Sequence, residues 1–90
     1  MSTTERILRG ESAATLINDP VYREAMDASL RFIQSRWAAT DMEDSTAREM
    51  LYHQFTAVHT LDDMLNNFIE DGTRAEREEA DNGDKSNTTG

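Results

Sequence analysis

Cysteine is absent from the 90-residue chain, and proline occurs only once. Without cysteine the chain has no disulfide framework, no thiolate nucleophile and no zinc site of the cysteine type, which fits a reducing compartment. No stretch approaches the roughly 18 uninterrupted apolar residues of a membrane span, and the N-terminal segment has no long apolar core of a signal peptide. The sequence therefore predicts a soluble cytoplasmic protein that makes no membrane contact.

Catalytic signatures are missing as well. The sequence shows no Gly-rich phosphate loop, nucleophile elbow or Ser-His-Asp arrangement. His53 and His59 would lie on different faces of one helix, and the pairs Glu49 with His53 and His59 with Asp63 offer only two metal ligands each. Neighbouring acids are more typical of helix caps and solvated faces than of paired catalytic carboxylates. We predict no enzymatic activity, no cofactor and no metal.

Basic residues are scarce: the chain has nine Lys and Arg and eighteen Asp and Glu, which give a formal net charge of −9. Long-range repulsion of phosphates argues against direct binding of nucleic acid. Six arginines that precede the acidic end could still form a basic end that touches nucleic acid or an acidic neighbour, although an ordinary mixed-charge helix surface is the more typical explanation: Arg6, Arg9, Arg23, Arg31, Arg36 and Arg48. The other end, residues 73–90, is acidic and poor in large apolar residues, which predicts a mostly disordered tail.

Apolar residues recur in three- and four-residue steps, which predicts an all-α protein with helices at about 3–18, 20–40 and 43–71. Ser2 with Glu5 has the spacing of a capping box, and Asp19 before Pro20 is a good start for the second helix. Residues 40–45 offer several overlapping caps before the third, among them Thr40 with Glu43 at capping-box spacing. This third helix either ends before Gly72 or continues raggedly to about Ala80. Gly10 either delays the first helix to about Glu11 or permits a close approach of another segment.

The predicted module, residues 1–72, is an antiparallel helical hairpin of coiled-coil type joined to a shorter N-terminal helix. At 1.5 Å per residue the third helix, about 42 Å long, overhangs the second, about 32 Å long, and the overhang is apolar. The first helix is the nearest cover within the chain, and otherwise a second chain must supply it. We therefore predict partner contacts or oligomerisation through an apolar set: Tyr22, Trp37, Phe55, Leu65, Phe68 and Ile69.

The segment RILRGESAATLINDPVYREAMDASL, a tryptophan, an acidic turn and AREMLYHQF together resemble small uncharacterised proteins of tailed bacteriophages. The matching positions cover about two thirds of the chain and end before the tail: Arg9, Gly10, Glu11, Ala13, Leu16, Asp19, Pro20, Val21, Trp37, Thr40, Arg48 and Glu49. The resemblance implies a phage origin among head and packaging genes. It also implies a place in the cytoplasm of the infected bacterium or in the virion.

These observations favour a non-enzymatic virion component or assembly accessory that acts through protein contacts, with a phage structural protein or a second copy of itself as the partner. The main alternative is an acidic inhibitor of a host or defence DNA-processing enzyme, which would present carboxylates where that enzyme expects phosphates. A third hypothesis, a small DNA-binding packaging subunit, depends on the N-terminal arginines and conflicts with the net charge of −9.

Overall fold

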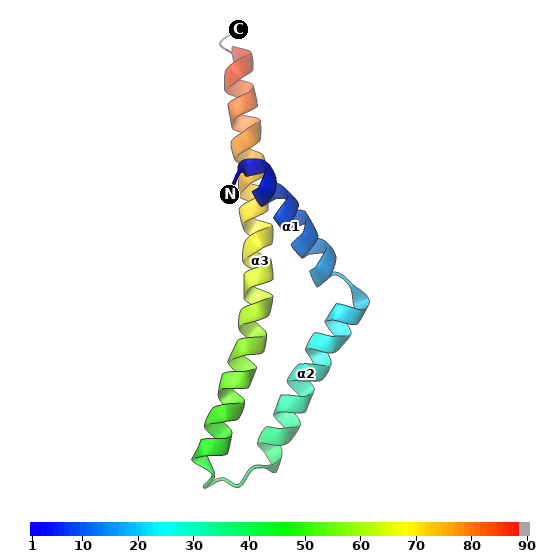
Figure 1. Cartoon of the computed structure of the whole chain (residues 1–90), viewed down its shortest axis with the longest axis vertical. Coiled ribbons are helices and arrows are strands. Elements are labelled where there is room, and N and C mark those ends of the chain that lie inside the picture. The colour runs from blue at the N-terminus through cyan, green and yellow to red at the C-terminus, as the bar shows by residue number, and fades with distance from the viewer. Residues whose placement is uncertain (89–90) are drawn as a thin grey trace. The chain divides into compact units, whose positions relative to one another are not determined.

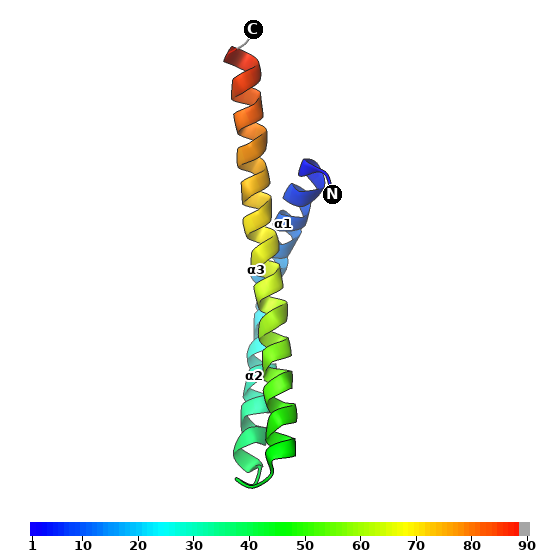
Figure 2. The ribbon, with the colours of Figure 1, turned by 90° about the vertical axis from the view of Figure 1, so that its left-hand side faces the viewer.

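The computed structural model describes the backbone of residues 1–88 and the side chains of residues 1–82. Three helices make up this part of the chain: α1 (Thr3–Ile17), α2 (Pro20–Ala39) and α3 (Ser45–Thr88) (Figures 1 and 2). The described residues include no strand, so the predicted all-α, three-helix fold is confirmed. The chain forms two compact units, one of Met1–Ile17 with Met64–Gly90 and the other of Asn18–Asp63.

The starts of the first two helices are as predicted. The Asp19 carboxylate accepts hydrogen bonds from the backbone N–H groups of Val21 and Tyr22 at 2.9 and 3.0 Å, and Pro20 occupies the first turn of α2. In the first unit, the Glu5 backbone N–H donates to the Ser2 hydroxyl at 3.1 Å, which satisfies one amide at the start of α1.

The third helix begins at Ser45, within the predicted run of overlapping caps, and the structure selects one of them. The Ala47 backbone N–H donates to the Asp44 carboxylate at 3.1 Å, so Asp44 rather than Thr40 caps α3. Thr40 instead ends α2, where its backbone N–H and its hydroxyl both donate to the Trp37 carbonyl oxygen. Thr40 does not cap α3 despite its capping-box spacing with Glu43, because it already forms the C-terminal cap of α2.

Of the two possibilities for the third helix, an end before Gly72 or a continuation to about Ala80, the structure has the continuation, and it extends past Ala80. Gly72 adopts no positive φ, and α3 continues through it to Thr88. The glycine is required by packing, since a Cβ built on it would lie 3.1 Å from the Gly10 Cα. Helix therefore covers residues 73–88 of the segment predicted to be a mostly disordered tail, and the prediction for residues 89 and 90 lies outside the described residues.

The first unit is held together where α1 crosses the C-terminal part of α3. Gly10 is buried inside α1, and a Cβ built on it would lie 2.9 Å from the Phe68 carbonyl oxygen. Small side chains continue the contact, because Ala13 and Ala75 are buried along with Leu65. Of the two possibilities predicted for Gly10, the structure has the close approach of another segment, here α3. α1 begins at Thr3, well before Glu11.

The second unit is an antiparallel pair formed by α2 and the N-terminal part of α3. Arg23 near the start of α2 lies 3.8 Å from the Asp62 carboxylate on α3, and at the other end the Arg48 side chain donates to the Thr40 hydroxyl at 3.1 Å. Of its large apolar residues only Ile33 and Leu51 are buried. Two helices alone leave most of their apolar side chains exposed, and these exposed side chains form apolar surfaces on the unit.

Candidate functional site

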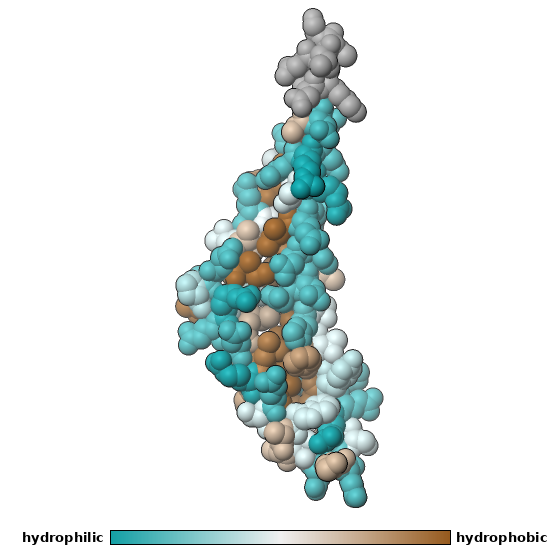
Figure 3. Space-filling view, turned by 180° about the vertical axis from the view of Figure 1, so that it is seen from behind, coloured by the Kyte–Doolittle hydropathy of each residue, from teal (hydrophilic) through white to brown (hydrophobic). Residues whose placement is uncertain are grey.

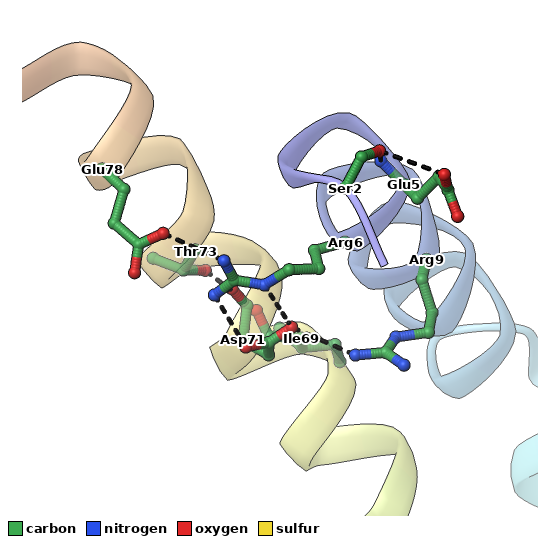
Figure 4. Close-up of polar contacts among 8 residues, drawn as sticks. All are labelled: Ser2, Glu5, Arg6, Arg9, Ile69, Asp71, Thr73 and Glu78. Carbon is green, nitrogen blue, oxygen red and sulfur yellow. Dashed lines mark hydrogen bonds and ion pairs between the residues drawn. The ribbon is translucent and has the colours of Figure 1, made fainter. Parts of the chain in front are cut away.

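Charged side chains gather at one place in the first unit, around Arg6 (Figure 4). Its guanidinium donates to both Asp71 carboxylate oxygens, at 2.9 and 3.0 Å, and to the Glu78 carboxylate at 2.9 Å. Arg9 adds a third cationic contact, 3.0 Å from Asp71, and its guanidinium stacks 4.2 Å from the Phe68 ring centroid. This cluster fastens α1 to α3, and its charges are already paired with one another.

Asp71 is affected most clearly by this cluster. Hydrogen bonding from Arg6, with a smaller contribution from Arg9, holds the pKa of the Asp71 carboxyl below its usual value. The same bonds from Arg6 to Asp71 and Glu78 raise the pKa of the guanidinium. The folded chain therefore favours the ionised pair, which is a structural arrangement and offers no group poised to accept or donate a proton near neutral pH.

The Asp71 contact predicts a pH dependence of stability. Because the folded pKa lies below the unfolded value of about 3.9, the ionised carboxylate stabilises the fold above that value, and this contribution is lost as pH falls through the folded pKa. We expect the urea midpoint of Asp71→Asn to fall less steeply between about pH 5 and about pH 2 than that of the unmodified chain. Asp63→Asn, which removes an exposed carboxylate of the second unit, is the control and should keep the original slope; equal slopes in both variants would contradict the assignment.

Five of the six arginines considered for a basic end contact other side chains of their own unit, and the sixth, Arg31, is exposed. Arg6 and Arg9 pair with acids of α3, Arg23 lies near Asp62, and two further guanidinium groups pack over rings of their own unit, Arg36 over Phe32 and Arg48 over Trp37. Arginines engaged in this way are poorly placed to meet phosphates, which weakens the DNA-binding hypothesis.

No group of three or more His, Cys, Asp or Glu side chains in the described residues is arranged to hold a metal ion. His53 lies 3.9 Å from the Glu49 carboxylate and edge-on to the Tyr52 ring, with centroids 5.9 Å apart. His59 packs edge-on against Phe55 with ring centroids 4.4 Å apart. Neither histidine therefore belongs to a convergent polar site within the part of the chain that the structure covers.

An apolar groove runs between α2 and α3 of the second unit, and we call it the aromatic groove. Its volume is about 240 Å³, its exposed lining is entirely apolar, and six residues line it: Ile33, Gln34, Trp37, Leu51, Tyr52 and Phe55. A space-filling view shows apolar side chains gathered along the seam between the helices and bordered by hydrophilic ones (Figure 3). Buried Ile33 and Leu51 lie beneath, whereas Trp37 and Tyr52 are 38% and 58% exposed.

Trp37 contacts two residues that do not line the groove, Arg48 and Thr40. The Arg48 guanidinium lies 5.2 Å from the Trp37 ring centroid, and its Nε donates to the Thr40 hydroxyl, which in turn donates to the Trp37 carbonyl oxygen at 2.6 Å. These contacts restrict the tryptophan rotamer before any partner arrives. A restricted aromatic side chain loses less conformational entropy on binding, which favours its use as an anchor.

The six residues predicted to contact a partner are divided between the two units. Trp37 and Phe55 meet in the aromatic groove. Tyr22 is half-buried and lies outside that lining, and its hydroxyl is buried with no hydrogen-bond partner among the described residues. Leu65 is buried, and Phe68 and Ile69 are half-buried, in the unit where α1 packs on α3. Their overhang thus has a cover within the chain, and their contact with a partner stays a prediction.

Tyr52 is the groove residue that the sequence reasoning missed. It stands beside the main apolar stripe of α3, next to Leu51, and single-helix periodicity does not distinguish this flank from a solvent-facing position. Its position three residues before Phe55 was the available signal, because residues three apart lie side by side on a helix.

No known protein family, curated protein or solved structure matches this chain. The likeness to tailed-phage proteins consequently stays a prediction that rests on the quoted residues. Within the described residues, no helix combines the length and the apolar content that crossing a bilayer requires.

Proposed function

We propose that the chain is a non-enzymatic, protein-binding component of a tailed bacteriophage, either in the virion or in its assembly, and that the aromatic groove is its binding surface. The observation that carries the binding role is the pair of exposed rings, Trp37 and Tyr52, above a floor of buried aliphatic residues. Exposed aromatic side chains beside a well-packed floor are typical of the central contacts of protein interfaces. The phage setting rests on the sequence resemblance alone.

Chemistry at the groove supports binding over catalysis. Its lining exposes no polar surface, so it offers no acid, base or nucleophile to a substrate. What it can accept is an apolar side chain, such as a leucine or phenylalanine presented by the partner, and the Arg48 guanidinium 5.2 Å from the Trp37 ring centroid adds a cation–π contact to that ring.

The test follows a tagged chain during infection by the phage that encodes it. We expect the chain in purified particles or in head assembly intermediates, quantified by mass spectrometry, and we expect at least about tenfold less in the double variant Trp37→Ala with Tyr52→Ala. Arg31→Ala, an exposed change on α2 outside the groove lining, is the matched control and should retain the association.

Two outcomes would overturn the proposal. One is absence of the chain from both particles and intermediates, and the other is undiminished association of the double variant while circular dichroism shows that its helices are intact. The second outcome would leave the phage role in place and would rule out the aromatic groove as the binding surface.

The inhibitor hypothesis has one observation in its favour, which is the exposed acids on the C-terminal part of α3. Glu70, Glu76 and Glu79 are exposed and make no ion pair with Arg6, unlike Asp71 and Glu78. Recovery of a DNA-processing enzyme with the tagged chain, lost when Glu76 and Glu79 become glutamine, would favour this alternative over the virion role.

A further inference from the structure

The second unit has another apolar surface, which includes none of the rings of the aromatic groove, Trp37, Tyr52 and Phe55. On α2 it follows steps of four and three residues, the spacing of a coiled-coil seam: Val21, Ala25, Ala28, Phe32, Ser35 and Ala39. On α3 the same alternation gives a second stripe within this unit: Met50, Gln54, Ala57 and Leu61. We call the two stripes together the heptad face.

Both stripes lie on the same side of the hairpin. Ala28 and Phe32 line one groove together with Gln54 and Ala57. Near the turn, Ala39 lines another groove with Met50 and Gln54. These neighbours also give the register of the two antiparallel helices, because Ala28 lies beside Ala57 and Phe32 lies beside Gln54. The contact between Arg23 and Asp62 continues the same register toward the start of α2.

The large side chains of the heptad face are open to solvent. Val21 is 71% exposed, Phe32 and Met50 are each 60% exposed, and Leu61 is 52% exposed. None of the stripe positions is acidic, although the chain carries eighteen acids. A surface that meets only water gains nothing from lacking carboxylates, whereas contact between two chains of charge −9 requires such a surface.

We infer that a second copy of this chain packs on the heptad face, so that α2 of each copy lies antiparallel to α3 of the other in a two-fold symmetric four-helix bundle. The side-chain sizes favour this pairing. The α3 stripe contributes long side chains such as Met50 and Leu61, and the α2 stripe contributes alanines that leave room for them. A two-fold axis parallel to the helices does not shift residues along the helix axis. The register within one hairpin therefore also holds between the copies, and Leu61 of one copy meets Ala25 of the other.

The available area is sufficient for a dimer. At 1.5 Å per residue α2 is about 30 Å long, and two helices side by side present a face about 20 Å wide. Two copies in contact would bury on the order of 1,200 Å², the lower end of the range for specific interfaces. Packing at that area in four-helix geometry also covers Ile33 and Leu51 from their second side.

The inference goes beyond the proposed function, because it uses the opposite side of the hairpin from the aromatic groove and needs no phage partner. It is therefore tested on the purified full-length chain. Loss of the dimer would leave particle association through Trp37 untouched, and failure of particle association would leave the dimer untouched.

Sedimentation equilibrium over a range of concentrations is the decisive measurement. We expect a dimer at about 100 μM that dissociates on dilution, and we expect Phe32→Glu to raise its dissociation constant at least about 100-fold, because a carboxylate would be buried without a partner. Tyr52→Glu places the same charge in the aromatic groove and should leave the dissociation constant within about threefold. A monomer at every concentration overturns the inference, as does a dimer broken by Tyr52→Glu and not by Phe32→Glu.

Cross-linking provides a second measurement that does not depend on a disruptive variant. The native chain has no cysteine, so single substitutions give an unambiguous bond. When Ala28→Cys and Ala57→Cys chains are mixed and oxidised, we expect the 28 to 57 disulfide between copies to dominate over both homodimeric bonds. Preference for a 28 to 28 bond would place α2 against α2 and overturn the proposed arrangement.

Discussion

Gly10→Ala is expected to destabilise the first unit by about 2 kcal/mol, although alanine is the better helix former by about 1 kcal/mol. The new Cβ would lie 2.9 Å from the Phe68 carbonyl oxygen and 3.1 Å from the Gly72 Cα. Both atoms belong to the backbone of α3, so no side chain can rotate away to relieve the contact. The helices must separate, and burial of Ala13 and Ala75 weakens with them.

Urea unfolding gives the magnitude of this effect, and hydrogen exchange gives its location, because the amides of α1 should lose protection first. Ser12→Ala is the matched control, since it raises helix propensity at an exposed position of the same helix and should stabilise slightly. If Gly10→Ala were as stable as Ser12→Ala, α1 would not pack on α3 at the distance described. Adding Gly72→Ala to Gly10→Ala should increase the loss.

Ile33→Ala is expected to destabilise the second unit by about 3 kcal/mol, within the range for large-to-small changes at buried sites. Ile33 is 7% exposed and, with Leu51, is one of two large apolar residues buried in this unit. It also lines the aromatic groove and the groove between the two heptad stripes, so its loss removes packing from both sides of the hairpin.

The magnitude is checked by urea unfolding at one fixed protein concentration, since the stability of any dimer depends on concentration. Ile33→Val removes a single methylene and should cost about 1 kcal/mol, while Arg31→Ala at an exposed position should change little. Equal losses from Ile33→Ala and Arg31→Ala would show that the hairpin does not depend on this core.

Local chemistry made the helices predictable from the sequence. The Asp19 and Pro20 pair fixes the start of α2 with groups only two or three residues apart, and the capping spacing of Ser2 and Glu5 does the same for α1. The apolar periodicity gave the hairpin for the same reason, because residues three and four apart must share a face.

Contacts between distant segments were harder to anticipate. Gly72 followed a long apolar run and had the sequence context of a helix end, and only the approach of Gly10 explains why it stays helical. The pairing of Arg6 with Asp71 likewise depends on how α1 crosses α3, which no local spacing encodes. In the candidate site, Trp37 and Phe55 were predictable as large aromatic residues, but their meeting with Tyr52 in one groove required the relative rotation of two helices.

The sequence separation of the Arg6 contacts has a consequence for synthesis. Arg6 meets Glu78, 72 positions further along the chain, whereas Thr40 and Arg48 meet across only eight. On the ribosome the hairpin of α2 and α3 can close from neighbouring residues as soon as both have emerged, because short loops close with the smallest entropy loss. α1 is translated first, but it is therefore the last helix to pack in place. A nascent chain that stalls before Asp71 leaves α1 without the part of α3 on which it packs.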